Sequence, residues 1–427
     1  MVTALPAMLA DVGASPDAGS LIATGYAMFF GGLLMLGARL GDRFGHRRVI
    51  VAGLVVFAVA ALVAATAGSV AVLTAARCLQ GAAAAMSVPA ALRLLTTITT
   101  DGPQRQKAIA AWSGAGAAAG ASGFVVGGVI TEFLGWRAVF WAFLPLAAVL
   151  SIAIVAAVPP DRGQTSIPLN PAGSGVFTAA VMLFVVATTL LPEPGRGLLG
   201  VALLVGSAVL AGGFVALDRR SGTPLLPPTL LRRRPHRHGT IGGLLNTFTT
   251  SSAITLLTLY LQNTLGRSPL AAAAMLVPFS LAVIVGSALA APVLSRWPPQ
   301  QVIAAGLTAI AVSDAGLIPA ADSSWALPMV VSVGGAGIGV SSVAATGLGT
   351  AVPPSARGTA SGIINTAAQL GTALGIAALL LVAAASGGVP GPGTSAPAIA
   401  WGVAALISLA GAATFLIWAR RDPRRLN

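Results

Sequence analysis

The chain has 427 residues, of which 56% are hydrophobic and only 8% are charged. About 25% of the residues in a soluble domain are charged, so this composition excludes a soluble globular protein. The formal net charge of +13 does not indicate a nucleic-acid-binding domain, because the basic residues stand between long apolar runs. The composition therefore predicts an all-α integral membrane protein with many spans.

Thirteen apolar runs are each about 17 residues or longer, which is enough to cross a bilayer as a helix. They occupy residues 20–38, 49–68, 70–97, 108–130, 138–158, 174–191, 197–217, 239–262, 269–291, 300–320, 326–349, 358–384 and 396–418. Before them, Met1–Leu9 rises only about 14 Å as a helix, roughly half of the hydrocarbon core. We interpret it as the outer end of an incomplete first span, because it lacks the basic region and cleavage site of a signal peptide.

The stretch between the first two complete runs, Ala38–Arg48, contains four arginines, one aspartate and two glycines. A basic turn between two membrane helices is retained on the cytoplasmic side. With this turn as reference, 20 of the 24 Lys and Arg residues fall in alternate loops on the cytoplasmic side, three fall in outer loops, and Arg77 lies inside a run. This bias predicts fourteen spans in the plasma membrane, with both chain ends cytoplasmic once the first span is complete.

An internal repeat relates the two ends of the chain at an offset of 253 residues. Val49–Leu54 corresponds to Val302–Leu307, and Arg43 corresponds to Arg296, whereas Ser295 replaces Asp42 in the second copy. Two parallel halves are typical of transporters whose substrate site lies between the halves. We expect an N-terminal helix bundle at residues 1–158, a linker with two extra spans and a basic cytoplasmic loop at 159–238, and a C-terminal bundle at 239–427.

The stretch Ala38–Arg48 resembles G-x-L-x-D-R-x-G-R-R, the signature between the second and third helices of major facilitator transporters, with Ala38 at the first glycine. The resemblance implies the major facilitator fold, with two six-helix halves and two extra spans between them. We hypothesise that a charge cluster in this stretch is a cytoplasmic latch that closes in one transport state and opens in the other. For the arginines alone, binding to anionic lipid is the alternative. The predicted latch residues are Asp42, Arg43, Gly45, Arg47 and Arg48.

Two residues are candidates for proton coupling. The segment Arg77–Gly81 resembles R-x-x-Q-G, a signature of proton-coupled major facilitators in which the arginine is tied to proton movement. Burial of an arginine in lipid costs about 3 kcal/mol, so we expect Arg77 to face a cavity or a partner. The alternative is an arginine satisfied by nearby carbonyl groups. Asp314 is the only acid at membrane depth, and an acid in that position is a functional candidate.

The run 108–130 is dense in glycine and alanine. It resembles the G-P-x-x-G-G signature of antiporters, with Gly123, Gly127 and Gly128 in place and Phe124 at the position of the proline. Loss of the proline removes the expected kink. Ordinary close packing of helices is the alternative explanation for these glycines.

The segment Arg357–Gly371 resembles R-G-x-A-S-G-x-x-N-T-x-R-Q-L-G of the fourteen-helix drug:proton antiporters, with Ala368 at the usual arginine. Polar groups on apolar helices can orient a lipophilic ligand, although each of them can instead hydrogen-bond helices together. The candidate substrate-binding residues are Tyr26, Gln80, Asn246, Tyr260, Gln262, Asn365 and Gln369.

The resemblance implies a monomeric exporter of lipophilic or cationic small molecules, such as drugs, antibiotics or secondary metabolites, that exchanges them for protons by alternating access. We expect no cofactor, metal or nucleic acid, and contact of anionic lipid headgroups with the basic loops. The chain lacks H-E-x-x-H, G-x-S-x-G and S-x-x-K, so the sequence does not indicate an enzyme. A proton-coupled uptake symporter, a uniporter and a non-transporting membrane protein remain as alternatives.

Overall fold

The computed structural model describes residues 8–9, 11–13, 18–100, 102–161, 163, 170–191, 195–222, 224–353, 356–387 and 397–421. Most of the predicted partial first span, Met1–Leu9, lies outside the described residues. A long helix coincides with each of the thirteen predicted runs. These are α2 (Ala18–Phe44), α3 (His46–Ala65), α4 (Val70–Ile98), α5 (Pro103–Leu134), α6 (Trp136–Ala157), α7 (Pro171–Leu190), α8 (Gly197–Arg220), α10 (Arg234–Leu259), α11 (Pro269–Leu294), α12 (Pro299–Ala320), α13 (Ala326–Gly349), α14 (Arg357–Ala385) and α15 (Ala398–Arg420).

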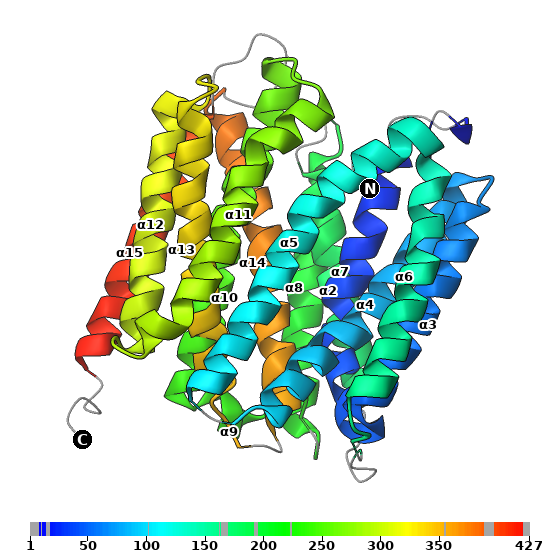
Figure 1. Ribbon diagram of the computed structural model, residues 1–427, viewed down its shortest axis with the longest axis vertical. Coiled ribbons are helices and arrows are strands. Elements are labelled where there is room, and N and C mark those ends of the chain that lie inside the picture. Colours follow the sequence, from blue (N-terminus) through cyan, green and yellow to red (C-terminus); the bar gives the residue numbers. More distant parts are fainter. Residues whose placement is uncertain are drawn as a thin grey trace. The chain divides into compact units, whose positions relative to one another are not determined.

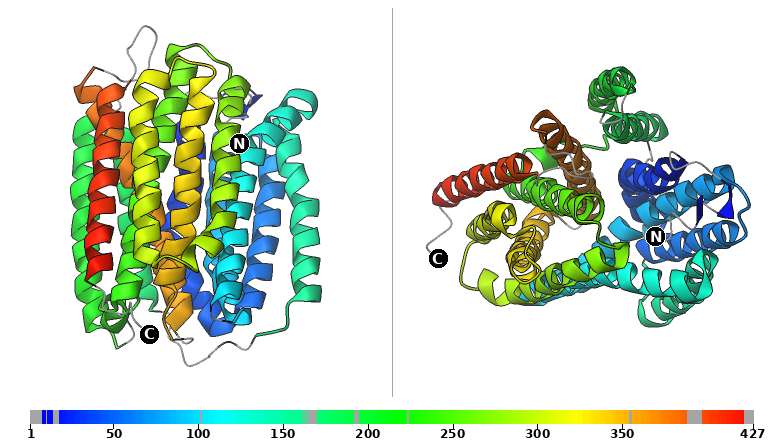
Figure 2. Two further views of the ribbon diagram at one scale, coloured as in Figure 1. Left: turned by 60° about the vertical axis from the view of Figure 1, so that its left-hand side comes forward. Right: turned by 90° about the horizontal axis from the view of Figure 1, so that it is seen from above.

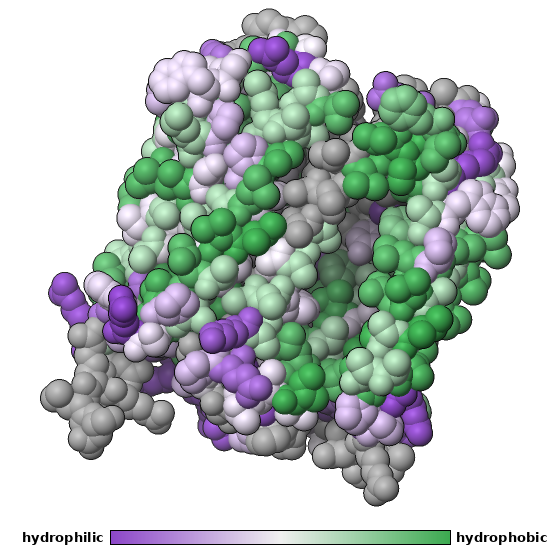
Figure 3. Space-filling model, viewed as in Figure 1, coloured by the Kyte–Doolittle hydropathy of each residue, from purple (hydrophilic) through white to green (hydrophobic). Residues whose placement is uncertain are grey.

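Two shorter elements complete the described secondary structure, which is helical throughout: α9 (Pro228–Leu231) and the π-helix η2 (Tyr260–Thr264), which extends α10. Ten of the helices in the described part of the chain are long and apolar enough to cross a membrane. Figure 3 shows apolar side chains along the helices and hydrophilic residues concentrated toward the helix ends. The prediction of an all-α, multi-span membrane protein is confirmed.

The described helices form two compact units. Unit 1 comprises Met1–Thr97, Val126–Leu231 and Pro353–Thr366, and unit 2 comprises Ile98–Val125, Arg232–Val352 and Ala367–Asn427. Two of the boundaries between the units fall inside α5 and α14. The division into bundle, linker and bundle that the repeat predicts stays an expectation.

Unit 1 contains α3 packed against α6, and α2 packed against α7 (Figure 1). Its apolar core includes Ile22, Leu73 and Phe140. Helices α2 and α4 approach closely because glycines lie between them: a Cβ on Gly37 would lie 2.7 Å from the Ala85 carbonyl carbon. Small residues at a helix interface allow this approach, which brings side chains of α2 and α4 into contact.

Unit 2 contains α12 between α13 and α15, as Figures 1 and 2 both show. Helix α11 also packs along α13, and α10 contacts α13 and α15. The core includes Ile303, Leu307 and Phe415. Helices α11 and α13 can approach closely because Gly339 has no side chain: a Cβ there would lie 2.9 Å from the backbone nitrogen of Ser287. Glycine therefore sets the helix spacing in both units.

Candidate functional site

The junction between α2 and α3 is a single residue, Gly45, and not the longer turn that the charges of Ala38–Arg48 suggest. Helix α2 continues to Phe44, since arginine is a good helix former even where the apolar run has ended. Gly45 has φ +94° and ψ 133°, a conformation that side chains disfavour. A Cβ there would also lie 2.8 Å from the backbone oxygen of Asp161. Only glycine fits both requirements.

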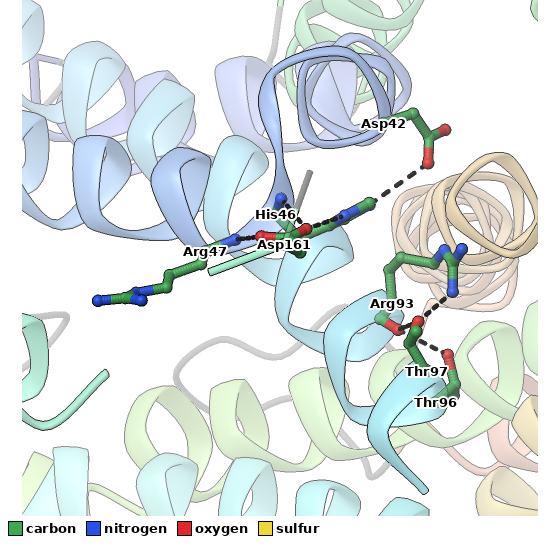
Figure 4. Close-up of polar contacts among 7 residues, drawn as sticks. All are labelled: Asp42, His46, Arg47, Arg93, Thr96, Thr97 and Asp161. Atoms are coloured by element: carbon green, nitrogen blue, oxygen red, sulfur yellow. Dashed lines mark hydrogen bonds and ion pairs between the residues drawn. The ribbon is translucent and has the colours of Figure 1, made fainter. Parts of the chain in front are cut away.

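The carboxylate of Asp161, which follows α6, caps the first turn of α3 (Figure 4). The backbone N–H of His46 donates to Asp161 Oδ2 at 2.6 Å, and the backbone N–H of Arg47 donates to Oδ1 at 2.9 Å. The His46 ring nitrogen Nδ1 lies 2.9 Å from the same Oδ2. Burial raises the pKa of the Asp161 carboxyl, but these hydrogen bonds to Arg47 and His46 outweigh it and hold the pKa below its ordinary value.

His46 connects two carboxylates from different segments. Its Nε2 lies 3.3 Å from Oδ1 of Asp42 on the last turn of α2, while Nδ1 faces Asp161 (Figure 4). A doubly protonated imidazole donates from both nitrogens, so the charged ring satisfies both carboxylates at once. The family pattern has an arginine at this position.

Asp42 is buried and faces the first turn of α14. A Cβ on Gly358 would lie 2.6 Å from both Cγ and Oδ2 of Asp42. A negative charge is favourable near the N-terminus of a helix, where the helix dipole is positive and backbone N–H groups have no intrahelical acceptor. About one helical turn away, Ala38 of α2 meets α14 in a second close approach, where a Cβ on Gly362 would lie 2.8 Å from the Ala38 Cβ.

The predicted latch arginines do not gather around Asp42. Arg47 extends to the other side of Asp161 (Figure 4) and donates from NH2 to the carbonyl oxygen of Val155 on α6 at 2.8 Å. Arg43 is half-buried with its guanidinium 5.5 Å from the ring centre of Phe44, and Arg48 is exposed. Two further arginines, Arg93 on α4 and Arg357 on α14, lie toward the α14 end of this site.

Two arginines on these helices bind the C-terminal turn of α4. Arg93 donates to the hydroxyl of Thr97 (Figure 4). Arg357 NH1 donates to the carbonyl oxygen of Thr96 at 3.2 Å. Carbonyl groups at a helix C-terminus lack intrahelical partners and attract cations. The first residue of α14 is therefore attached to α4, and the second lies against Asp42.

Arg77, Gln80 and Tyr26 form one group on α4 and α2. Arg77 NH1 donates to Gln80 Oε1 at 2.8 Å, and the Arg77 guanidinium carbon lies 4.6 Å from the centre of the Tyr26 ring. Gln80 is fully buried, whereas Arg77 and Tyr26 are half-buried. The cation therefore has a ring and an amide as partners, and no ion pair joins it to a carboxylate among the described residues. The expected contact of Arg77 with a partner is met by Gln80 and Tyr26.

Asp314 lies in the interior of unit 2, on α12, with 3% of its surface exposed. Its Oδ2 is buried and accepts no hydrogen bond within the described residues. The neighbouring Ser313 hydroxyl donates to the carbonyl oxygen of Val330 on α13, so it is already engaged. A buried carboxylate with no cation beside it costs several kcal/mol when ionised.

The three antiporter-like glycines lie on α5, which is one uninterrupted helix with Pro103 only at its start. Phe124 replaces the proline of the pattern, which agrees with the absence of a break in the helix. Gly127 is buried, and its carbonyl oxygen accepts a 2.6 Å hydrogen bond from the Thr131 hydroxyl. The surroundings of Gly123 and Gly128 lie outside what the structure describes.

The remaining polar candidates divide into two groups. Asn246 is fully buried, and its Oδ1 accepts from the Ser341 hydroxyl at 3.0 Å. Tyr260 is also buried and donates from its hydroxyl to Asp322 at 2.7 Å. The second group keeps part of its side chains accessible and comprises Tyr26, Gln262, Asn365 and Gln369.

The sequence profile of the Major Facilitator Superfamily matches residues 1–376 and, in a second match, residues 239–427. The two matches together cover the whole chain. The protein belongs to the major facilitator superfamily. This confirms the family that the motifs on α2, α4, α5 and α14 indicate.

The relatives of this major facilitator include named exporters. The chain is 34% identical to a cephamycin export protein of Amycolatopsis lactamdurans over 90% of this chain and 80% of that protein. It is 33% identical to a puromycin resistance protein of Streptomyces alboniger, over 88% of this chain and 76% of the relative. It is 31% identical to a tetracenomycin C resistance and export protein of Streptomyces glaucescens, over 88% and 70% of the two chains. These relatives support a drug exporter.

The fold matches that of another major facilitator of known structure. The crystal structure of the human organic anion transporter MFSD10 superposes with a TM-score of 0.68 over 96% of this chain and 88% of that chain. The two sequences are 15% identical, so the comparison establishes the fold alone.

Sequence reasoning missed three acids that the structure places at helix junctions. Asp161 caps α3, and Asp322 binds Tyr260. Asp218 on α8 is buried and accepts from the backbone N–H groups of Leu225 and Leu226 at 2.6 and 2.9 Å. Only eleven Asp and Glu residues occur in the chain, and this scarcity was the available signal that individual acids could have specific structural roles.

Proposed function

We propose that this major facilitator exports lipophilic or cationic small molecules in exchange for protons, by alternating access. The observation that carries the export direction is the similarity to cephamycin and tetracenomycin C export proteins over about nine-tenths of the chain. The names of the same relatives state antibiotic export, which supports a small-molecule substrate for this chain. Alternating access is the mechanism by which two-fold repeat transporters move a substrate past a fixed site.

The proposed coupling residue is Arg77. Its partners Gln80 and Tyr26 are neutral groups, so the positive field of the guanidinium is not cancelled by an ion pair. Two cations about 6 Å apart repel by roughly 3 kcal/mol at an effective dielectric constant of about 20, which corresponds to about 100-fold in affinity. The charge of Arg77 would therefore weaken the binding of any cation beside it, and a proton and a cationic substrate bound at this distance from each other would exclude each other. Mutual exclusion of two ligands is the requirement for exchange.

The second proposed coupling residue is Asp314. Its carboxyl group lies in the interior of unit 2 with a buried, unpaired oxygen, so a proton on it removes the cost of a buried charge. Proton release would require a state in which the side chain meets water. Asp314→Asn keeps the size of the side chain and removes its ability to carry a proton.

We further propose that Asp42 and Gly358 form the contact that opens and closes in the latch. The carboxylate of Asp42 lies against the first turn of α14, where the helix dipole favours it by about 0.3–1 kcal/mol. An interaction of this size holds one state without making it permanent. Among the polar candidates, those with accessible side chains are the proposed substrate contacts: Tyr26, Gln262, Asn365 and Gln369.

Transport by the purified full-length chain in vesicles tests this proposal. In vesicles with outward-facing cytoplasmic surfaces, an acidic interior should drive uptake of a cationic dye, and a protonophore should stop it. Arg77→Gln and Asp314→Asn should each lower proton-driven uptake at least about tenfold. Arg77→Gln removes the fixed charge that repels bound cations, and Asp314→Asn removes the group that carries the proton. Arg77→Lys keeps the charge and should retain part of the activity.

The control is Arg267→Gln, which removes the same charge from an exposed residue between η2 and α11. Thermal unfolding of each variant shows whether its fold is kept. Dye uptake that persists at full rate without a proton gradient would refute the coupling. Accumulation of dye only in vesicles of the opposite orientation would refute export and favour an uptake symporter or uniporter.

A further inference from the structure

A groove of about 470 Å³ lies between α3 and α6, beside the α2–α3 junction. Arg47 and Arg48 line its polar end, and Val51, Ala52 and Val155 line its apolar walls. The groove is contained within unit 1, so its shape depends only on helices that pack directly against each other. None of the proposed coupling or substrate residues lines it.

The polar end of the groove attracts an anion. The hydrogen bond from Arg47 NH2 to the carbonyl oxygen of Val155 holds this guanidinium at the rim, and among the described residues its other N–H groups have no hydrogen-bond acceptor and are available to a ligand. Arg48 is the next residue and is exposed. Asp161 also lines the groove, but both of its carboxylate oxygens already accept N–H groups from the first turn of α3. Two arginines against one saturated carboxylate leave a net positive charge.

The apolar end of the groove continues along the membrane-facing sides of both helices. Val55 and Val59 follow Val51 at four-residue intervals on α3, so they lie on one face of that helix. On α6, Ile152 precedes Val155 by one turn. The side chains of Val55, Val59 and Ile152 are 53%, 51% and 69% exposed, which leaves an apolar surface open to an acyl chain.

We propose that this groove binds an anionic phospholipid, with its phosphate between Arg47 and Arg48 and one acyl chain along Val55 and Val59. The arrangement matches the phospholipid in both charge and polarity, because the start of α3 is basic and the surface toward the middle of α3 is apolar and exposed. Arginine side chains at a helix end reach the headgroup region while their stems stay in apolar surroundings. Free phosphate fits only the polar end and leaves the exposed apolar surface uncovered.

The lipid would join α3 to α6 at the point where Asp161 caps α3. Binding of a ligand to the folded state raises its stability by mass action. The expected result is that phosphatidylglycerol raises the unfolding temperature of the full-length protein in detergent, compared with phosphatidylcholine of the same chain length. Native mass spectrometry of the same samples counts the bound lipids and gives their affinity.

Two variants remove the two ends of the site separately. Arg48→Gln should weaken phosphatidylglycerol binding about fivefold, because one basic residue near an anionic headgroup is removed. Ala52→Trp keeps both arginines and fills the groove from an exposed position, so it should also weaken binding. The controls are Arg296→Gln, which removes the same charge from an exposed residue between α11 and α12, and Val209→Trp, which places a tryptophan at an exposed position of α8; both should leave binding unchanged.

Each other outcome overturns the proposal. Equal weakening by Arg296→Gln would mean that lipid binds through net charge and not in this groove. An equal rise in unfolding temperature with inorganic phosphate at matched ionic strength would identify a phosphate site without an acyl chain. If Ala52→Trp bound phosphatidylglycerol as well as the wild type, the groove and the apolar surface beside it would not hold the lipid. Both groove variants are at exposed or half-exposed positions, and their unfolding temperature without added lipid shows that they are folded.

Discussion

Asp161→Asn tests the structural account of the α2–α3 junction. The wild-type carboxylate accepts the backbone N–H groups of His46 and Arg47 and faces the His46 ring at 2.9 Å. An asparagine offers one acceptor oxygen in place of two, so it keeps the His46 side and turns its amide donor toward the Arg47 N–H. Hydrogen bonds to a charged group are worth about 1.5–3 kcal/mol, and loss of a helix cap costs about 1 kcal/mol. We expect a loss of about 2 kcal/mol.

The measurement is the unfolding temperature of the purified protein in detergent. A loss of about 2 kcal/mol lowers it by roughly 4–8 °C for a unit of this size. Glu132→Gln is the control, because it makes the same change from carboxylate to amide on an exposed side chain. If Asp161→Asn were no less stable than Glu132→Gln, the cap would not stabilise α3 and the reasoning would be refuted.

The same variant has a defined pH dependence. The pKa of Asp161 is lower in the folded protein than in the unfolded chain, because the N–H groups of Arg47 and His46 favour its ionised form. Its contribution to stability is therefore complete above the unfolded pKa of about 4 and is lost as the pH falls through the folded pKa. The stability difference between wild type and Asp161→Asn should stay constant from about pH 5 to 8 and shrink below about pH 4.

Two further substitutions test contacts at other sites. Gly358→Ala should cost about 1–3 kcal/mol, because the added methyl group overlaps Asp42, and Asp42→Ala in the same chain should relieve that loss. The control is Gly347→Ala, whose added Cβ has nothing within 4 Å and which should be neutral or stabilising. If Gly358→Ala lost no more stability than Gly347→Ala, the contact with Asp42 would be contradicted. Tyr260→Phe should cost about 1–2 kcal/mol by removing the 2.7 Å hydrogen bond to Asp322, with Asp322→Asn adding little in the double variant. Additive losses in the unfolding temperature would show that the two residues act independently.

The apolar runs and the local motifs were sufficient to predict most of the fold. A helix coincides with each predicted run, because the backbone N–H and C=O groups of a membrane span must hydrogen-bond within that span. Hydropathy alone therefore locates the helix. The grouping of Arg77 with Gln80 was also readable, since residues three apart lie on one face of a helix. The run limits were less accurate at Gly45, where the helix continues through charged residues after the apolar run ends.

Contacts between distant segments required the structure. Asp161 is 115 residues from His46, and no local pattern predicts that it caps α3. The sequence grouped Arg47 with Asp42, yet the guanidinium of Arg47 binds Val155 on the far side of Asp161 (Figure 4). A side chain six or more atoms long can reach several partners, and packing decides which one it reaches.

The sequence by itself determined that this chain is a multi-span major facilitator, since low charge, apolar runs and the motif around Asp42 each act locally along the chain. Only the tertiary structure decided what each charged group does. It placed Asp42 against Gly358, gave Arg77 two neutral partners, and opened a groove between α3 and α6 beside Arg48. The physical reason is that the hydrophobic effect and backbone hydrogen bonding specify helices from nearby residues, whereas the energy of a charge depends on what other helices bring next to it.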